Sequence, residues 1–199
     1  MAHMLSALRH SVPFLAALSL ASCAGSNFVR PDDSTFKLGT TSYKEVIERM
    51  GPPTRTAETI FKETGKRVKT VSYSYATYRA VRMRLQVYVF YKDVLVSREF
   101  TSNFPEDSSD WNERKVDNLV RGKTTRAEVI RMLGRPSGAR IWPAVANTFG
   151  EAITYHFSYY TSKHTLGARK TLRHTKNLVI TFDTKDQILE IYYAKQDDK

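Results

Sequence analysis

The most reactive side chain in this sequence is that of Cys23, the only cysteine among the 199 residues. A single thiol cannot form an intramolecular disulfide and cannot supply a cysteine metal cluster. Covalent modification of the sulfur by an external group is the chemistry that remains for it. The residues around Cys23 therefore decide what it is used for.

The other residues capable of chemistry lack the spacing that catalysis or metal binding requires. His156, His164 and His174 form no His-x-x-x-His pattern and have no carboxylate at ligand spacing. The alternation of apolar and polar residues around His156 favours an ordinary strand histidine. The sequence also has no phosphate-binding glycine loop and no Gly-x-Ser-x-Gly nucleophile motif. We therefore predict a protein that is not an enzyme, with no catalytic residues, no metal site and no cofactor.

The N-terminus has the layout of a secretory signal. Arg9 and His10 close a short positively charged opening, and residues 11–22 form an apolar stretch. A helix of that length reaches only about 18 Å at ~1.5 Å per residue, whereas the hydrocarbon core of a bilayer is roughly 30 Å thick. The stretch is therefore predicted to be a signal rather than a transmembrane helix.

The end of this stretch resembles the lipobox that bacterial lipoprotein signal peptidase recognises. The matching residues are Leu20, Ala21, Ser22 and Cys23. The resemblance implies that residues 1–22 are removed and that Cys23 is acylated, which would attach the chain stably to a membrane. Ala24 stands where lipoproteins retained in the inner membrane have Asp, so the resemblance also favours sorting to the outer membrane. The expected localisation is the periplasm-facing side of that membrane, which this residue does not decide. Residues 23–35 are polar and are predicted to be a solvated tether of roughly 20 Å.

Residues 39–53 and residues 122–136 align without a gap. Both segments have a Gly-x-Thr opening, a Ser or Thr followed three residues later by Glu, a Val-Ile pair, and a Gly ahead of a Pro. The shared positions are Gly39, Thr41, Glu45, Gly51 and Pro53 in the first segment and Gly122, Thr124, Glu128, Gly134 and Pro136 in the second. This self-similarity indicates a duplication.

Each copy is predicted to contain a short helix followed by strands. Ser42 with Glu45, and Thr125 with Glu128, have the spacing of a capping box, and the glycine and proline that follow are typical of a helix end. Apolar residues then recur with the period of two that is typical of half-buried strands. We predict an α+β fold made of two tandem units, 36–102 and 113–195, joined by a linker, 103–112. Each unit would have one or two short helices packed on a three-stranded antiparallel sheet.

The order of these motifs resembles a known family. The Gly-x-Thr opening, the helix, the Leu-Gly-x-Pro end and the later Phe149-Gly150 resemble the SmpA/OmlA lipoproteins, which include BamE-like subunits of the outer-membrane β-barrel assembly machine. Two such units in tandem also resemble the architecture of β-lactamase inhibitor proteins. The resemblance implies protein binding, with Phe149 and Gly150 in a candidate binding loop. The chain departs from the family in having two units, in Met50 and Pro52 of the first copy, and in a basic insertion at 162–176.

The charge of the chain suggests an anionic partner. Lys and Arg number 31 against 20 Asp and Glu, which gives a formal net charge of +11. A basic body near an anionic surface gains roughly 1 kcal/mol per basic residue within a Debye length. The candidate lipid-binding residues of the insertion are Lys163, Arg169, Lys170 and Arg173. Nucleic acid is not an expected partner, because a secreted and tethered chain rarely meets it.

Three functions remain open from the sequence. The first is an outer-membrane-associated lipoprotein that acts as a non-catalytic binding module in envelope or β-barrel assembly and maintenance. The second is an inhibitor or modulator of an envelope enzyme, which predicts a concave sheet with exposed aromatic residues from both copies. The third is a tether that binds anionic lipid or cell-wall polymer through the basic insertion.

Overall fold

The computed structural model describes residues 26–62, 64–77, 82–107, 109–146, 150–165 and 168–197, without the side chains of 163–169. The predicted signal segment, the lipobox from Leu20 to Cys23, and Phe149 lie outside the described residues. Within the described part, no helix is both long enough and apolar enough to cross a bilayer.

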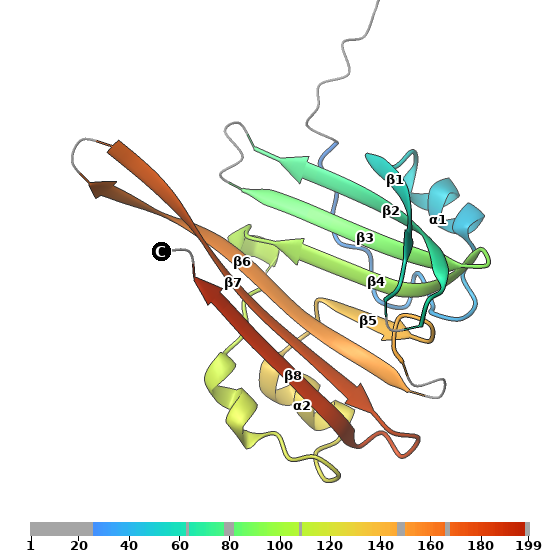
Figure 1. The fold of residues 1–199 in the computed structure, drawn as a ribbon. Helices are drawn as coiled ribbons and strands as arrows, with labels where there is room; N and C mark the ends of the chain where they lie inside the picture. The colour runs from blue at the N-terminus through green and yellow to red at the C-terminus, as the bar shows by residue number, and fades with distance from the viewer. Residues whose placement is uncertain are drawn as a thin grey trace, which may run out of the picture.

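The described chain consists of eight strands and four short helical segments (Figure 1). In chain order these are α1 (Tyr43–Met50), β1 (Arg55–Ile60), β2 (Arg67–Ala76), β3 (Met83–Tyr91), β4 (Val94–Ser102), the 3₁₀ helices η2 (Pro105–Asp107) and η3 (Glu113–Asn118), α2 (Arg126–Leu133), β5 (Gly138–Ile141), β6 (Glu151–Thr165), β7 (Ala168–Phe182) and β8 (Ile188–Asp197).

All eight strands belong to one antiparallel sheet in the order β1 to β8. The prediction of an α+β fold with two separate units, each with helices on its own three-stranded sheet, is therefore wrong. Each copy contributes four strands, and β5 of the second copy pairs with β4 of the first. The sequence did not predict β1 and β5, because neither strand has a clear alternation of apolar and polar residues. Strand β1 is an exposed edge with little apolar alternation, and β5 is only four residues long.

The duplication appears as matching hydrogen bonds in the two copies. In the first copy, the Tyr73 hydroxyl donates to the carbonyl oxygen of Gly51 at 2.9 Å. In the second copy, the Tyr155 hydroxyl donates to the carbonyl oxygen of Gly134 at 2.9 Å. Both glycines have a positive φ, 75° and 85°, which favours glycine at the point where each helix ends. A strand tyrosine thus satisfies the carbonyl of the glycine that caps each helix and fixes the end of the helix on the sheet.

The helices start with the same cap in both copies. Ser42 and Glu45 form a complete capping box at α1, and Thr125 and Glu128 form one at α2. Each cap satisfies two backbone N–H groups that the first helical turn would otherwise leave without partners. Both helices are only eight residues long, so these caps and the packing on the sheet must supply most of their stability.

The main core lies between the sheet and the helices. The buried residues of the first copy are Phe36, Val46, Val71, Tyr73, Tyr88, Phe90 and Leu95. Those of the second copy are Trp111, Leu119, Val129, Leu133, Ile153, Tyr155, Leu178, Ile180, Phe182 and Ile188. A smaller cluster, Val68, Val89 and Val96, lies on the opposite face, where Trp142 packs edge-on against Tyr91 with ring centroids 5.2 Å apart.

The antiparallel order gives the sheet two distinct ends. Strands β2, β4, β6 and β8 all finish at one end, which we call the hairpin end because the long β6–β7 hairpin projects from it (Figure 1). The end of β2, the start of β3 and the last described residue, Asp197, lie there as well. The turn from β3 to β4, the start of β6 and the turn from β7 to β8 lie at the opposite end.

Candidate functional site

The predicted binding residues do not form one site. Gly150 immediately precedes β6 and so lies at the opposite end, whereas Lys170 and Arg173 lie on the exposed β6–β7 hairpin. Lys170 pairs with Lys163 and Arg173 pairs with Tyr160, so the two places are separated along β6 by about 33–43 Å at ~3.3 Å per residue. Phe149 and the side chains of Lys163 and Arg169 are outside the described part. The loop and the basic hairpin are therefore separate surfaces.

The histidines are used in cross-strand contacts. His156 contacts the side-chain oxygen of Asn177, and His174 Nδ1 lies 2.8 Å from Asp197 Oδ1. His174 Nε2 also lies 2.8 Å from Thr161 Oγ1, so Thr161, His174 and Asp197 have the order of a hydroxyl–imidazole–carboxylate triad. Catalysis by such a triad needs backbone or side-chain donors that stabilise an oxyanion. Thr161 and His174 lie within the β6–β7 ladder, where these contacts join side chains of neighbouring strands.

Metal binding has no candidate residues in the described part either. Among the residues described, no group of three or more His, Cys, Asp or Glu side chains could hold a metal ion.

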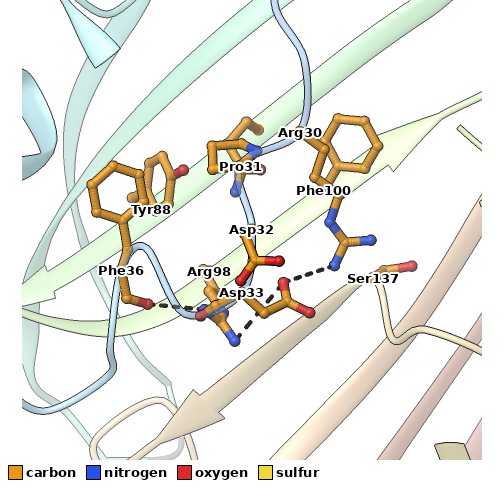
Figure 2. A pocket seen from close by; sticks show the side chains of 10 residues that line it. Arg30, Pro31, Asp32, Asp33, Phe36, Tyr88, Arg98, Phe100 and Ser137 are labelled. Carbon is orange, nitrogen blue, oxygen red and sulfur yellow. Dashed lines mark hydrogen bonds and ion pairs between the residues drawn. The ribbon is translucent and has the colours of Figure 1, made fainter. Parts of the chain in front are cut away.

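Residues 27–36, which we call the strap, lie against the sheet where the two copies meet (Figure 2). Phe36 packs edge-on against Tyr88 with ring centroids 5.3 Å apart, and the Arg30 guanidinium lies 5.3 Å from the centroid of Phe100. The Arg98 guanidinium donates to the carbonyl oxygen of Phe36 at 2.9 Å. The cavity under the strap measures about 10 Å³, room for about one water molecule. The strap therefore packs closely on the sheet at this point.

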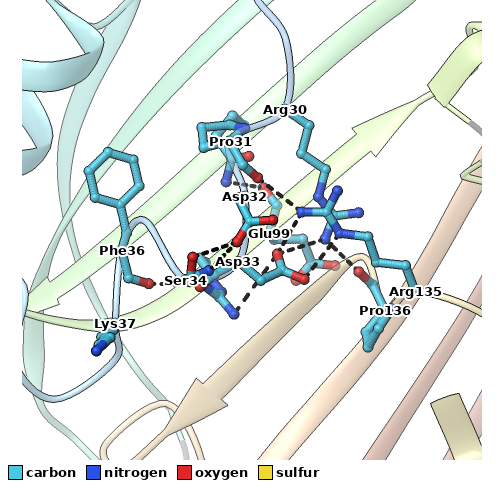
Figure 3. A network of polar contacts seen from close by, with 12 residues as sticks. Arg30, Pro31, Asp32, Asp33, Ser34, Phe36, Lys37, Glu99, Arg135 and Pro136 are labelled. Carbon is cyan, nitrogen blue, oxygen red and sulfur yellow. Dashed lines mark hydrogen bonds and ion pairs between the residues drawn. The ribbon is translucent and has the colours of Figure 1, made fainter.

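One carboxylate in the strap organises three arginines from both copies (Figure 3). Asp33 accepts two hydrogen bonds from Arg135, at 2.9 and 3.1 Å, and one from Arg30 at 3.3 Å. Arg98 Nη2 lies 3.9 Å from the same carboxylate. Burial alone would raise the pKa of Asp33, but the Arg135 hydrogen bonds and the charges of Arg30 and Arg98 outweigh it and lower the pKa below its usual value. The strap therefore ties the first copy to the segment that follows α2 in the second.

The strap begins with a contact that the second copy repeats. Arg84 is buried, with 6% of its surface exposed, and donates to Asn27 Oδ1 at 2.7 Å and to the carbonyl oxygen of Phe28 at 3.3 Å. Lys176 is similarly buried, at 8% exposed, and its ammonium lies 2.6 Å from Asp110 Oδ1 and contacts the carbonyl oxygen of Trp111. These equivalent contacts extend the first copy back to Asn27.

The two buried cations also hold the segment between the copies. Arg84 lies 2.6 Å from Asp107 and 3.0 Å from Glu106, and Lys176 lies 2.8 Å from Glu113. A buried charge is stable only when it is paired and hydrogen-bonded, so each cation requires these acids. From the sequence, both residues belong to basic clusters expected at the surface, and their burial was not predicted. The only signal was a polar–aromatic pair, Asn-Phe and Asp-Trp, at matching distance before Gly39 and Gly122, which is too common to be read without the structure.

A groove of about 450 Å³ lies at the hairpin end, on the helix-bearing side of β7 and β8. We call it the β8 groove, and it is lined by Asp110, Glu113, Phe157, Tyr159, His174, Thr175, Lys176, Lys195 and Asp197. Tyr159 stacks on His174 with ring centroids 4.6 Å apart and packs against Phe157 at 5.8 Å. The groove therefore combines an aromatic wall with charged groups of both signs, and its volume suits a ligand group or a side chain of a partner.

Glu113 in the β8 groove makes stability depend on pH. The hydrogen bond from Lys176, at 2.8 Å, lowers the pKa of Glu113 to about 2, and Lys195 at 3.4 Å adds to the effect. A folded-state pKa below the unfolded value stabilises the protein above the unfolded pKa, near 4.3, and this contribution is lost as the pH falls towards 2. We expect Glu113→Gln to lower the free energy of unfolding at pH 7 and to cost progressively less between about pH 4.3 and 2. Urea denaturation between pH 7 and 2 measures the free energy of unfolding of this variant. Glu190→Gln, at an exposed position of β8, is the control. A Glu113→Gln cost that is independent of pH would contradict the assignment.

Comparison with known proteins gives one structural likeness. No family model matches the chain, and no curated protein matches it at a significant level. The crystal structure of a candidate β-lactamase inhibitor protein from Streptococcus mutans is similar, with a TM-score of 0.43 and 12% identity over 77% of this chain and 82% of that chain. A TM-score this low carries no argument about function. Membership of the SmpA/OmlA family remains a prediction from the motifs alone.

Proposed function

We propose that this protein is a non-catalytic binding module of the bacterial cell envelope, tethered to the periplasmic face of the outer membrane by acylated Cys23. The lipobox-like residues at 20–23 support the tether. The paired strands around Thr161 and His174 support a binding role rather than catalysis. The strongest support comes from the short distance in the chain between Cys23 and the first residue that packs on the sheet.

The folded body begins only four residues after Cys23. Asn27 is fixed by Arg84 at the start of β3, which lies at the hairpin end of the sheet. Four residues span at most about 14 Å at ~3.6 Å per residue. An acyl group on Cys23 would therefore hold the hairpin end close to the lipid surface, and the opposite end would point away from it.

The charge of the hairpin suits that orientation. Residues 152–182 contain no Asp or Glu, whereas the hairpin carries several Lys and Arg residues. Lys170 and Arg173 are exposed there, and Lys176 is buried and paired. Basic groups within a Debye length of an anionic membrane each contribute roughly 1 kcal/mol to binding. We propose that the hairpin binds anionic lipid and so keeps this end of the protein at the membrane surface.

Neutralising the hairpin should weaken binding to anionic vesicles. Lys163, Arg169, Lys170 and Arg173 would be replaced together by Gln, and we expect a loss of at least tenfold in affinity for vesicles of 30% phosphatidylglycerol, as several contacts of roughly 1 kcal/mol are removed. Co-sedimentation of the non-acylated Cys23→Ser protein measures it. The control replaces four basic residues away from the hairpin, Lys62, Lys66, Lys92 and Lys185. Equal losses for both sets, or none, would reject a role for the hairpin.

The protein partner is the finer part of the proposal. Among the described residues, the exposed tyrosines are Tyr159, Tyr160, Tyr192 and Tyr193, and all belong to the second copy. Tyrosine supplies anchor contacts in many interfaces, so a partner protein is expected to contact the second copy first. Affinity purification of the lipidated protein from gently solubilised membranes, with Cys23→Ala as control, tests this. Recovery of β-barrel assembly subunits supports that role, and a soluble envelope enzyme supports the modulator role instead.

A further inference from the structure

The two copies differ at one place in the hairpin end. Phe28 packs edge-on against Phe100 with ring centroids 6.4 Å apart, and Trp111 packs in the same way against Tyr193 at 5.9 Å. Phe100 and Tyr193 are thus equivalent. Four residues further along the chain from each of them, Phe104, which follows the end of β4, is the counterpart of Asp197, the last residue of β8.

In the first copy, an aromatic side chain fills the space beyond the strand. Phe104 is buried, with 9% of its surface exposed, and stacks on Tyr75 with ring centroids 6.0 Å apart. The guanidinium of the buried Arg84 lies 4.4 Å from the centre of the Phe104 ring. The ring therefore closes the end of the first core beside its buried cation.

The residues after Phe104 pair with the same region through their carboxylates. Glu106 and Asp107 lie 3.0 and 2.6 Å from Arg84, and Ser102 donates a hydrogen bond to Asp107 at 2.5 Å. The occupant of this space is thus a short segment with an aromatic side chain followed two and three residues later by carboxylates.

In the second copy, the equivalent space is the β8 groove. Asp197 stands in place of Phe104, and Phe157 stands in place of Tyr75. The buried Lys176 takes the place of Arg84, with its ammonium 5.6 Å from the centre of the Phe157 ring. The second copy therefore has the aromatic residue Phe157 and the cation Lys176, but it has no counterpart of the Phe104 ring. The groove of about 450 Å³ lies at that position.

We propose that the β8 groove binds a partner peptide whose aromatic side chain is followed two or three residues later by a carboxylate. The aromatic ring would pack on Phe157 and Tyr159, as Phe104 packs on Tyr75. The carboxylate would pair with Lys195, whose side chain is 47% exposed and lies 3.4 Å from Glu113. Lys195 lies opposite Lys176 in the strand register, as Ser102 lies opposite Arg84, so the two copies place these groups alike.

This site goes beyond membrane tethering and does not depend on it. The groove is formed by side chains of the folded second copy, so peptide binding is expected whether or not Cys23 is acylated. A failure of acylation would leave the groove intact, and a failure of peptide binding would leave the tether intact. The two proposals are therefore tested separately.

The protein supplies the first probe, because residues 102–107 occupy the equivalent space in the first copy. A fluorescently labelled peptide of that sequence would be titrated with the purified full chain and followed by fluorescence anisotropy. We expect saturable binding with a dissociation constant below about 1 mM, and at least tenfold weaker binding when the phenylalanine of the peptide is replaced by alanine. Equal affinity of the two peptides would mean attraction by charge alone and would overturn the proposal.

Two phenylalanine variants locate the binding. Asp197→Phe places in the groove the residue that the first copy has there, and should abolish peptide binding by filling the site from within. Gln196→Phe adds the same ring on the opposite face of β8, because Gln196 lies between Lys195 and Asp197, which both line the groove, and successive strand residues alternate faces. It should bind the peptide like the unaltered protein. Thermal unfolding verifies that both variants fold. Equal binding by both, or loss in both folded variants, would reject the β8 groove as the site.

Discussion

Gly138→Ala is expected to destabilise the protein by about 3 kcal/mol, the upper range for adding one carbon to a packed site. Gly138 lies in β5, between Glu99 of β4 and Thr154 of β6. A Cβ atom there would overlap the carbonyl oxygen of Arg98 and lie 2.8 Å from Thr154 Oγ1 and 3.0 Å from the Glu99 Cα. Because two of these are backbone atoms of the neighbouring strand, no side-chain rotation relieves the contact. The strand that joins the two copies would have to move.

Urea denaturation measures this effect, and Gly65→Ala is the matched control. Gly65 has a φ of 65° with nothing within 4 Å of an added Cβ, so its substitution costs only the backbone strain of about 1 kcal/mol. Equal losses for the two variants would show that β4 and β5 are not packed as tightly as described.

Arg84→Met is expected to destabilise the protein by about 3–5 kcal/mol, the usual cost of removing one partner of a buried ion pair. Arg84 donates to Asp107, Glu106 and Asn27, and the side chain of Asp107 is only 12% exposed. Methionine preserves much of the volume but leaves that carboxylate buried without its cation. The change should loosen both the strap and the segment after β4.

Two further variants separate charge from packing at this site. Arg84→Lys introduces the residue that the second copy has at this position, so it should cost less than Arg84→Met while losing the forked hydrogen bonds of arginine. Arg82→Met removes an exposed arginine that lies near the Phe104 ring, as Arg84 does. This change should alter the free energy of unfolding by less than about 0.5 kcal/mol. Equal stability of Arg84→Met and Arg82→Met in urea denaturation would contradict the ion-pair account.

Local features of the fold could be read from the sequence because they depend on neighbours in the chain. The capping boxes need only a hydroxyl at Ser42 or Thr125 and a carboxylate three residues later. The end of each helix needs only a residue that tolerates a positive φ, as at Gly51 and Gly134. The helices and the repeat were therefore predictable from spacing alone.

The arrangement of the sheet could not be read in this way. Joining two sets of four strands depends on β5 pairing with β4, and β5 has only four residues with no clear alternation. The start of the first copy at Asn27 depends on a contact with Arg84, 57 residues later in the chain. Neither feature leaves a periodic pattern in the sequence.

The candidate sites divide in the same manner. The basic hairpin could be predicted from the sequence because its Lys and Arg residues lie close together in the chain with no Asp or Glu among them. Its position in the fold came from the structure. The β8 groove was not visible, because it depends on Asp197 standing where the other copy has Phe104. That comparison requires the strand register, including the shifts between Val89 and Phe90 and between Thr181 and Phe182.

Tethering through Cys23 is tested most directly by intact-mass and peptide mass spectrometry of the protein purified from membranes of its bacterial host. We predict a mature N-terminus at Cys23 carrying the mass of attached acyl chains, and a Cys23→Ala variant that lacks this mass and leaves the membrane fraction. A mature chain that retains the residues before Cys23, or a Cys23 with a free thiol, would contradict the proposed tether.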